Sequence, residues 1–160
     1  MSNSDNMTKH EVLVETEKHI KNVEILMRKL AYMLIDRGEV HDLSKTRSPE
    51  LPIFMEYTSK LATSTYGSDE YKQFLIEMKP ALDHHYAHNR HHPEHFDDGI
   101  NEMNLIDLIE MFCDWKAATM RHNDGDITKS IEINRKRFGI SDQLANILHN
   151  TVDILQGYTS

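Results

Sequence analysis

The sequence predicts an all-α fold, a single-domain helical bundle of about six helices. Apolar residues recur at a three-and-four spacing in successive segments, prolines and glycines separate those segments, and no stretch alternates polar and apolar residues as a strand would. A chain of 160 residues fits one domain and buries roughly 70% of its unfolded surface, which is enough for an ordinary core. We therefore expect one domain over residues 1–160, with residues 1–8 flexible.

The first helix is expected from about residue 9 to residue 37. Thr8 and Glu11 form a capping box ahead of it, and neither proline nor glycine interrupts it before Gly38. Its apolar residues follow one stripe, and His19 lies on that stripe. The spacing therefore predicts that the His19 side chain points inward.

Two further helices precede the middle of the chain. Residues 38–48 are polar and are expected to form a loop, and the segment Ser48-Pro49-Glu50 then begins a helix that runs to about residue 62. Ser68 begins the next helix, which continues into a histidine-rich segment and is expected to bend at Pro80.

The second half of the chain predicts three helices. Residues 103–121 are apolar nearly all round, which indicates a central buried helix, and two shorter helices follow at about 126–138 and 141–157. The charged residues of the central helix share one narrow stripe, and charges on a buried helix need a metal, a partner or water. This stripe contains Asp107, Glu110, Asp114 and Arg121.

Six of the eleven histidines fall between residues 84 and 95. The apolar face of the preceding helix continues at helical spacing into His85 and His92, whereas a parallel polar row carries His84, His88 and His91. This phase favours His85 and His92 as inward-facing residues. Because Pro80 and Pro93 can break the helical phase, His84 and His91 remain alternatives.

The inward-facing candidates form a set of potential metal ligands. Neutral imidazole and carboxylate bind borderline divalent metals, so the set predicts one or two ions of Mn, Fe, Co, Ni or Zn. Asp42 can bridge two ions, and Asp107 and Glu110 are expected to support the ligands or to face water. The blander alternative is a solvated histidine cluster that binds metal adventitiously. The predicted ligands are His19, His41, Asp42, His85, His92 and Asp114.

These residues resemble the HD-domain superfamily of metal-dependent phosphohydrolases in their order along the chain. An early helical histidine is followed by the His41-Asp42 pair, by later histidines and by a distal aspartate. Over most of its length the chain resembles a family of small HD-like proteins of phages and bacteria. Three motifs carry that resemblance, HD-x-SK at 41–45, N-x-HHPEH at 89–95 and EM-x-x-DW at 110–115. The resemblance implies an HD-like helical fold.

The function that follows is hydrolysis of a phosphate ester or anhydride by metal-activated water. Lys45, three residues beyond Asp42, and Arg121, on the charged stripe, are expected to neutralise charge that develops on phosphate oxygens. Glu50 is a candidate for steering the attacking water. An equally good interpretation of Glu50 is a helix N-terminal acid.

Composition limits the partners. The net charge of −8 repels nucleic acid polymers, but a small phosphorylated substrate, most simply a nucleotide, can still enter a pocket that holds divalent cations. No apolar run is long enough to span a membrane, and the single cysteine fits a reducing compartment, so we expect a cytoplasmic protein. A homo-oligomer is compatible with the sequence.

Two other function classes share the same ligands. Some HD-domain proteins hold a di-iron centre and oxygenate small molecules, so the resemblance allows an oxygenase as well as a hydrolase. The third class is a non-catalytic, metal-stabilised interaction protein, such as a phage factor that acts on a host partner. The identity of the metal and the presence of turnover distinguish the three.

Overall fold

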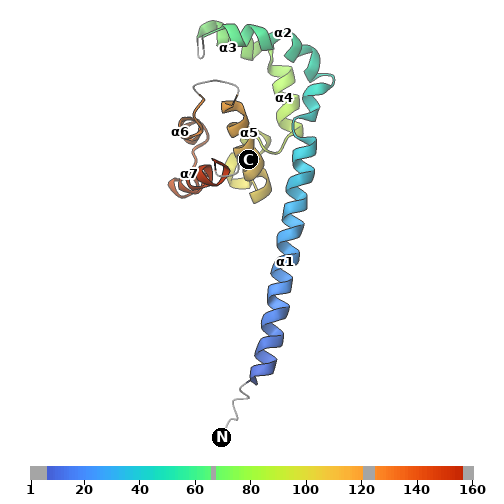
Figure 1. Cartoon of the computed structure of the whole chain (residues 1–160). Coiled ribbons are helices and arrows are strands. Elements are labelled where there is room, and N and C mark those ends of the chain that lie inside the picture. The colour runs from blue at the N-terminus through green and yellow to red at the C-terminus, as the bar shows by residue number, and fades with distance from the viewer. Residues whose placement is uncertain (1–6, 66–67, 121–124, 157–160) are drawn as a thin grey trace. The chain divides into compact units, whose positions relative to one another are not determined.

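A computed structural model describes residues 7–65, 68–120 and 125–156, and this part of the chain is all-α (Figure 1). It contains helices and no strand, as the sequence predicts. Three short 3-10 helices, η1, η2 and η3, supplement the α-helices at Leu43–Thr46, Pro93–His95 and Gly99–Glu102. The α-helices are α1 (Lys9–Val40), α2 (Glu50–Thr63), α3 (Asp69–Glu77), α4 (Lys79–His88), α5 (Leu105–Thr119), α6 (Ile127–Phe138) and α7 (Asp142–Gln156).

The third expected helix is divided into α3 and α4 at Met78. Pro80 stands in the first turn of α4, where its missing N–H is tolerated, but it cannot continue the hydrogen bonding of α3. The described residues therefore form seven α-helices, and the division explains the difference from the six expected.

The chain divides into two compact units, residues 1–39 and residues 40–160, whose positions relative to each other are not determined. The first unit contains all of the long helix α1 except its last residue, and none of the residues of α1 is buried. The expected single domain therefore stays a prediction, and the flexibility expected for residues 1–8 falls largely outside the described residues. No helix of the described segments has the length and apolar character needed to cross a membrane.

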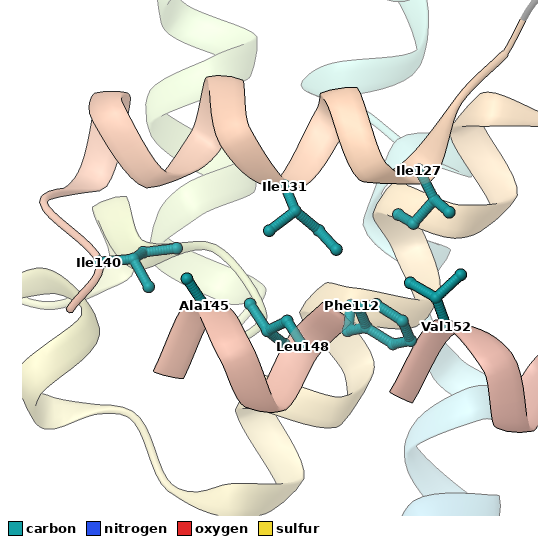
Figure 2. Packing of buried hydrophobic residues seen from close by; sticks show 7 residues of the cluster. All are labelled: Phe112, Ile127, Ile131, Ile140, Ala145, Leu148 and Val152. Carbon is teal, nitrogen blue, oxygen red and sulfur yellow. The ribbon is translucent and has the colours of Figure 1, made fainter. Parts of the chain in front are cut away.

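The core of the second unit lies between α5, α6 and α7 (Figure 2). Phe112 of α5 meets Ile131 of α6 and Leu148 of α7 in one buried cluster, and the rings of Trp115 and Phe138 pack against its edge. This cluster fixes α5, which carries the charged stripe identified in the sequence.

The prediction that α5 is buried nearly all round was only partly correct. Ile106, Met111 and Phe112 are buried, but Leu105 is 69% exposed and Ile109 is 43% exposed. Leu105, Ile109 and Cys113 follow one another at a spacing of four residues and form one exposed stripe of the helix.

The helices α2 and α4 pack against each other and against η1. Met78 and Ala81 are fully enclosed at this contact. The packing holds residues 41–46 next to the C-terminal end of α4, where the histidine-rich segment begins.

Candidate metal centre

Four segments of the second unit converge on one cluster of imidazoles and carboxylates. His41 and Asp42 lie just before η1, His85 lies on α4, and α5 contributes the carboxylates of Glu110 and Asp114. The remaining members, His91 and His92, lie in the turn between α4 and η2. The candidate ligand atoms form three overlapping groups, and the atoms of each group lie within 4.8 Å of one another.

Asp42 occupies the centre of the cluster and has an unusual backbone conformation. Its φ of 56° and ψ of 14° place it in the left-handed region, where aspartate is tolerated better than most residues. A residue keeps such a conformation only where the surrounding structure holds it. Residues of this kind are concentrated at functional sites. The conformation turns the Asp42 carboxylate toward the histidines of the α4 end.

The two carboxylate oxygens of Asp42 face different histidines. Oδ1 lies 3.3 Å from His85 Nε2 and 3.5 Å from His91 Nε2, whereas Oδ2 lies 3.5 Å from His41 Nε2. The Nε2 atoms of His85 and His92 lie 2.9 Å apart. Asp42 is therefore shared between two of the groups, as a bridging carboxylate requires.

These separations fit atoms that share a metal ion. Two ligand atoms each about 2.1 Å from an ion lie roughly 3.0 to 3.4 Å apart at octahedral or tetrahedral angles. Asp42 Oδ1 and both ring nitrogens of His91 are buried, and no hydrogen bond of good geometry satisfies them, although His91 Nδ1 lies 3.0 Å from Glu110 Oε1. Buried polar atoms normally have partners, and these atoms are placed where a cation could satisfy them. The donor set of imidazoles and carboxylates suits a divalent transition metal.

A second part of the cluster surrounds His41. Its Nδ1 lies 3.0 Å from Glu110 Oε1, and its Nε2 lies 3.6 Å from Asp114 Oδ1. The interactions with Asp114 and Glu110 raise the pKa of His41 to about 10, although burial opposes the change. The carboxylates of this region therefore stabilise a positive charge, which can be a proton on His41 or a metal cation.

Two further residues of the centre, His92 and Asp42, respond differently to burial. Burial of the His92 ring lowers its pKa to about 3, with a contribution from the neighbouring histidines, so the ring stays neutral and keeps a lone pair for a metal. For Asp42, burial would raise the pKa, but the interaction with the nearby His85 ring, the hydrogen bond from Lys45 and the positive charges nearby lower it overall. Asp42 is therefore ionised at neutral pH.

Glu50 holds the inner histidine in position. This carboxylate is fully buried, and it accepts hydrogen bonds from His84 Nδ1 at 2.7 Å and from His85 Nδ1 at 2.9 Å. Burial would raise the pKa of Glu50, yet the hydrogen bonds with His84, Ser44 and His85 lower it overall. An ionised Glu50 keeps the His85 proton on Nδ1 and leaves Nε2 free to bind a cation.

Lys45 and Asn89 complete the surroundings. The Lys45 ammonium lies 2.6 Å from Asp42 Oδ2, so it is close to the His41-Asp42 pair. Asn89 donates to Ser44 Oγ at 2.8 Å and to the His85 carbonyl at 2.8 Å, which ties the end of α4 to η1.

The structure brings together five of the six predicted ligands, His41, Asp42, His85, His92 and Asp114. His91, kept as an alternative to His92, joins the cluster together with it. The reason is that α4 ends at His88 and Asn89 is extended, so the helical phase that separated His91 from His92 no longer applies. His84 is outside the three groups of the described residues and bonds Glu50 instead.

His88 and His95 bond backbone carbonyls. His88 Nδ1 donates to the His84 carbonyl at 2.7 Å, and His95 Nδ1 donates to the Tyr86 carbonyl at 2.8 Å. Neither belongs to a candidate metal group of the described residues.

Three other expectations have different outcomes. Glu110, expected only to support the ligands, supplies an oxygen to a candidate group with His41 and His91. His19 lies exposed on α1, and its role as a ligand stays a prediction because α1 is not placed relative to the centre. Arg121 lies outside the described residues.

Glu50 was assigned a water-steering role, with a helix N-terminal acid as the alternative. It is the first residue of α2, in agreement with the alternative, and its carboxylate bonds two imidazoles. Sequence spacing could not reveal this link, because 35 positions separate Glu50 from His85.

Comparison with known proteins identifies a family. The chain belongs to DUF5662, a family of unknown function, whose model matches residues 8–154. No curated protein and no solved structure shows significant similarity to the chain.

Proposed function

We propose that this protein is a metal-dependent phosphohydrolase that acts on a small phosphorylated molecule, most simply a nucleotide. The observation that carries the proposal is the enclosed ligand set around Asp42, in which buried nitrogen and oxygen atoms lack hydrogen-bond partners. One or two divalent transition metals would be held by His41, Asp42, His85, His91, His92 and Asp114, with Glu110 beside them. When bound, such a metal lowers the pKa of a water molecule toward about 7 and polarises a phosphoryl oxygen.

The residues around the ligands have distinct roles in this proposal. Glu50 orients the His85 ring and fixes the position of its proton, because both of its oxygens already bond imidazoles. This role replaces the water-steering role expected from the sequence. Lys45 is the cation next to Asp42, and its side chain is 39% exposed, so it can reach a phosphate oxygen as well as the carboxylate.

The charge of the chain supports a small substrate. A net charge of −8 disfavours a polyanion that contacts a wide surface, whereas a mononucleotide needs only the local field of the centre. A hydrolase of this kind needs no serine or cysteine nucleophile, since water attacks the phosphorus.

The test combines elemental analysis with an activity panel. The purified chain is loaded separately with Mn, Co, Ni, Zn and Fe, and it is assayed with nucleoside mono- and triphosphates, cyclic nucleotides and a generic phosphodiester. We expect hydrolysis with at least one metal. Lys45→Ala should lower turnover by about 10- to 1000-fold while metal content stays at the wild-type level, because Lys45 acts on developing charge. Lys60→Ala, which removes an ammonium of α2 that bonds Glu56, is the matched control.

Other outcomes identify the rival functions. Oxygen consumption by the iron form with no hydrolysis of any substrate would replace the hydrolase with the di-iron oxygenase. A fully metallated protein that is silent in both assays would point to the non-catalytic interaction protein.

A further inference from the structure

A pocket of about 270 Å³ opens beside the candidate metal centre within the second unit. His92 and Asp114, both members of the metal cluster, line one side of it. The other side is formed by the C-terminal half of α6, with Asn134 and Arg137, and by the Trp115 ring of α5. A molecule whose reacting group binds at the cluster can therefore place the rest of its structure in this pocket.

Arg137 is held in a defined position at the pocket. Its Nη2 donates to Glu94 Oε1 at 2.7 Å, and its guanidinium lies over the Phe138 ring at 4.7 Å from the centroid. It also interacts with the Tyr86 hydroxyl. Glu94 occupies only part of the guanidinium, which has five N–H donors, so donors remain for a bound anion.

The basic segment 135–137 contains two arginines whose surroundings differ. The sequence alone suggests only a solvated helix face. Arg135 pairs with Asp142 and Glu132 on the outside of α6. Arg137 lines the pocket. The difference provides a matched pair of cations on one helix.

The pocket also presents flat apolar surfaces. The rings of Trp115 and Phe138 are parallel to within 5°, with centroids 6.4 Å apart, and both line the pocket. Aromatic faces of this kind contact planar rings favourably. The side-chain amide of Asn134 adds hydrogen-bonding groups at the same wall.

We propose that this pocket is the substrate-recognition site of the centre and that it selects a mononucleotide-sized phosphate monoester. This inference rests on the proposed function. The phosphate lies at the end formed by His92 and Asp114 and pairs with Arg137, and the planar ring of the same molecule lies against Trp115 and Phe138.

Size and charge both favour a monophosphate. Pockets for drug-sized ligands range from about 300 to 1,000 Å³, so a pocket of about 270 Å³ suits a small ligand and not a dinucleotide. Among the described lining residues the pocket has one Lys or Arg side chain, Arg137, and two carboxylates, those of Glu94 and Asp114. A triphosphate would bring more negative charge than this wall can neutralise.

The test uses the single tryptophan of the chain, Trp115, as a reporter of occupancy. The full chain is loaded with Zn²⁺, and its fluorescence is followed during titration with a nucleoside 5′-phosphonate, in which carbon replaces the ester oxygen and prevents hydrolysis. We expect a saturable change in the wild type. Arg137→Ala should weaken binding by about 10- to 100-fold, Arg137→Lys should recover part of the loss, and Arg135→Ala should bind as the wild type does.

The outcomes separate this inference from the proposed function. Absence of a fluorescence change, or equal binding by the wild type and Arg137→Ala, overturns the recognition site even if the protein hydrolyses phosphate esters. Tighter binding of a nucleoside triphosphate than of the monophosphate analogue overturns the substrate class. Arg137-dependent binding in a metallated protein that hydrolyses nothing overturns the proposed function and leaves the pocket as a binding site for nucleoside monophosphates.

Discussion

Two imidazole–carboxylate pairs of the second unit are nearly identical in chemistry and differ in their surroundings. His85 and Glu50 lie 2.9 Å apart inside the bundle, with side chains 2% and 0% exposed. His149 and Glu132 lie 2.8 Å apart on α7 and α6, with side chains 30% and 44% exposed. Burial therefore differs far more than the distance between the paired atoms.

The difference shows that the function of such a pair depends on the ring nitrogen that does not bond the carboxylate. His85 Nε2 faces Asp42 Oδ1 at 3.3 Å and His92 Nε2 at 2.9 Å, so the carboxylate on one side fixes a donor atom for a cation on the other. His149 belongs to no candidate metal group among the described residues. The same kind of pair thus supports a candidate metal ligand in one place and joins two helices in the other.

The largest expected effect comes from substitution of Asp42, whose carboxylate faces His85 and belongs to two of the candidate metal groups. Asp42→Asn keeps the shape of the side chain and tolerates the left-handed backbone, but it removes the charge that two groups share. We expect metal content after native purification to fall below about 0.2 per chain, against about one or two in the wild type. Elemental analysis measures this.

Asp83→Asn serves as the control for Asp42→Asn. Asp83 is an exposed carboxylate of α4 that pairs with Lys79, so its substitution should leave metal content unchanged. Wild-type metal content in a folded Asp42→Asn protein would show that these side chains do not form the site.

The next effect distinguishes His91, a member of the cluster, from His88, which lies outside it. His91→Asn should weaken metal affinity by about 100-fold or more, because it removes a buried nitrogen that faces Asp42. His88→Asn should change the affinity little, since His88 is exposed and bonds a carbonyl of its own helix. Competition with a chromophoric chelator gives both affinities, and equal losses in the two variants would contradict the assignment.

The comparison of the two pairs is tested directly with their carboxylates. Glu50→Gln keeps the size of the residue but no longer fixes the proton of His85, so metal affinity should fall by about 10- to 100-fold. Glu132→Gln makes the same change in the exposed pair and should leave metal affinity at the wild-type value. If both substitutions lower affinity equally, the effect is one of general stability.

The sequence predicted the all-α fold and most members of the imidazole–carboxylate cluster for identifiable reasons. Helical spacing located His85, and the order of the motifs located His41, Asp42 and Asp114. Spacing failed at His91 because the helix ends before that residue, and no rule of periodicity extends into a turn. The sequence did not indicate the contacts that Glu50 and Arg137 make, because those contacts depend on how segments distant in sequence pack.

The smallest expected effect concerns the exposed pair and its dependence on pH. The hydrogen bond with His149 lowers the pKa of Glu132 from its ordinary value of 4.5. A carboxyl with a lowered folded-state pKa contributes stability above its unfolded-state pKa and loses it as the pH falls through the folded-state value. At pH 6 to 7, His149→Ala should therefore lower the melting temperature by only about 1 to 3 °C. The difference between variant and wild type should shrink below about pH 4.5. Thermal unfolding of both proteins between pH 3 and 7 measures it, and the shared effects of acid on the metal centre cancel in the difference. A gap that widens in acid would show that His149 stabilises the protein through some interaction other than that with ionised Glu132.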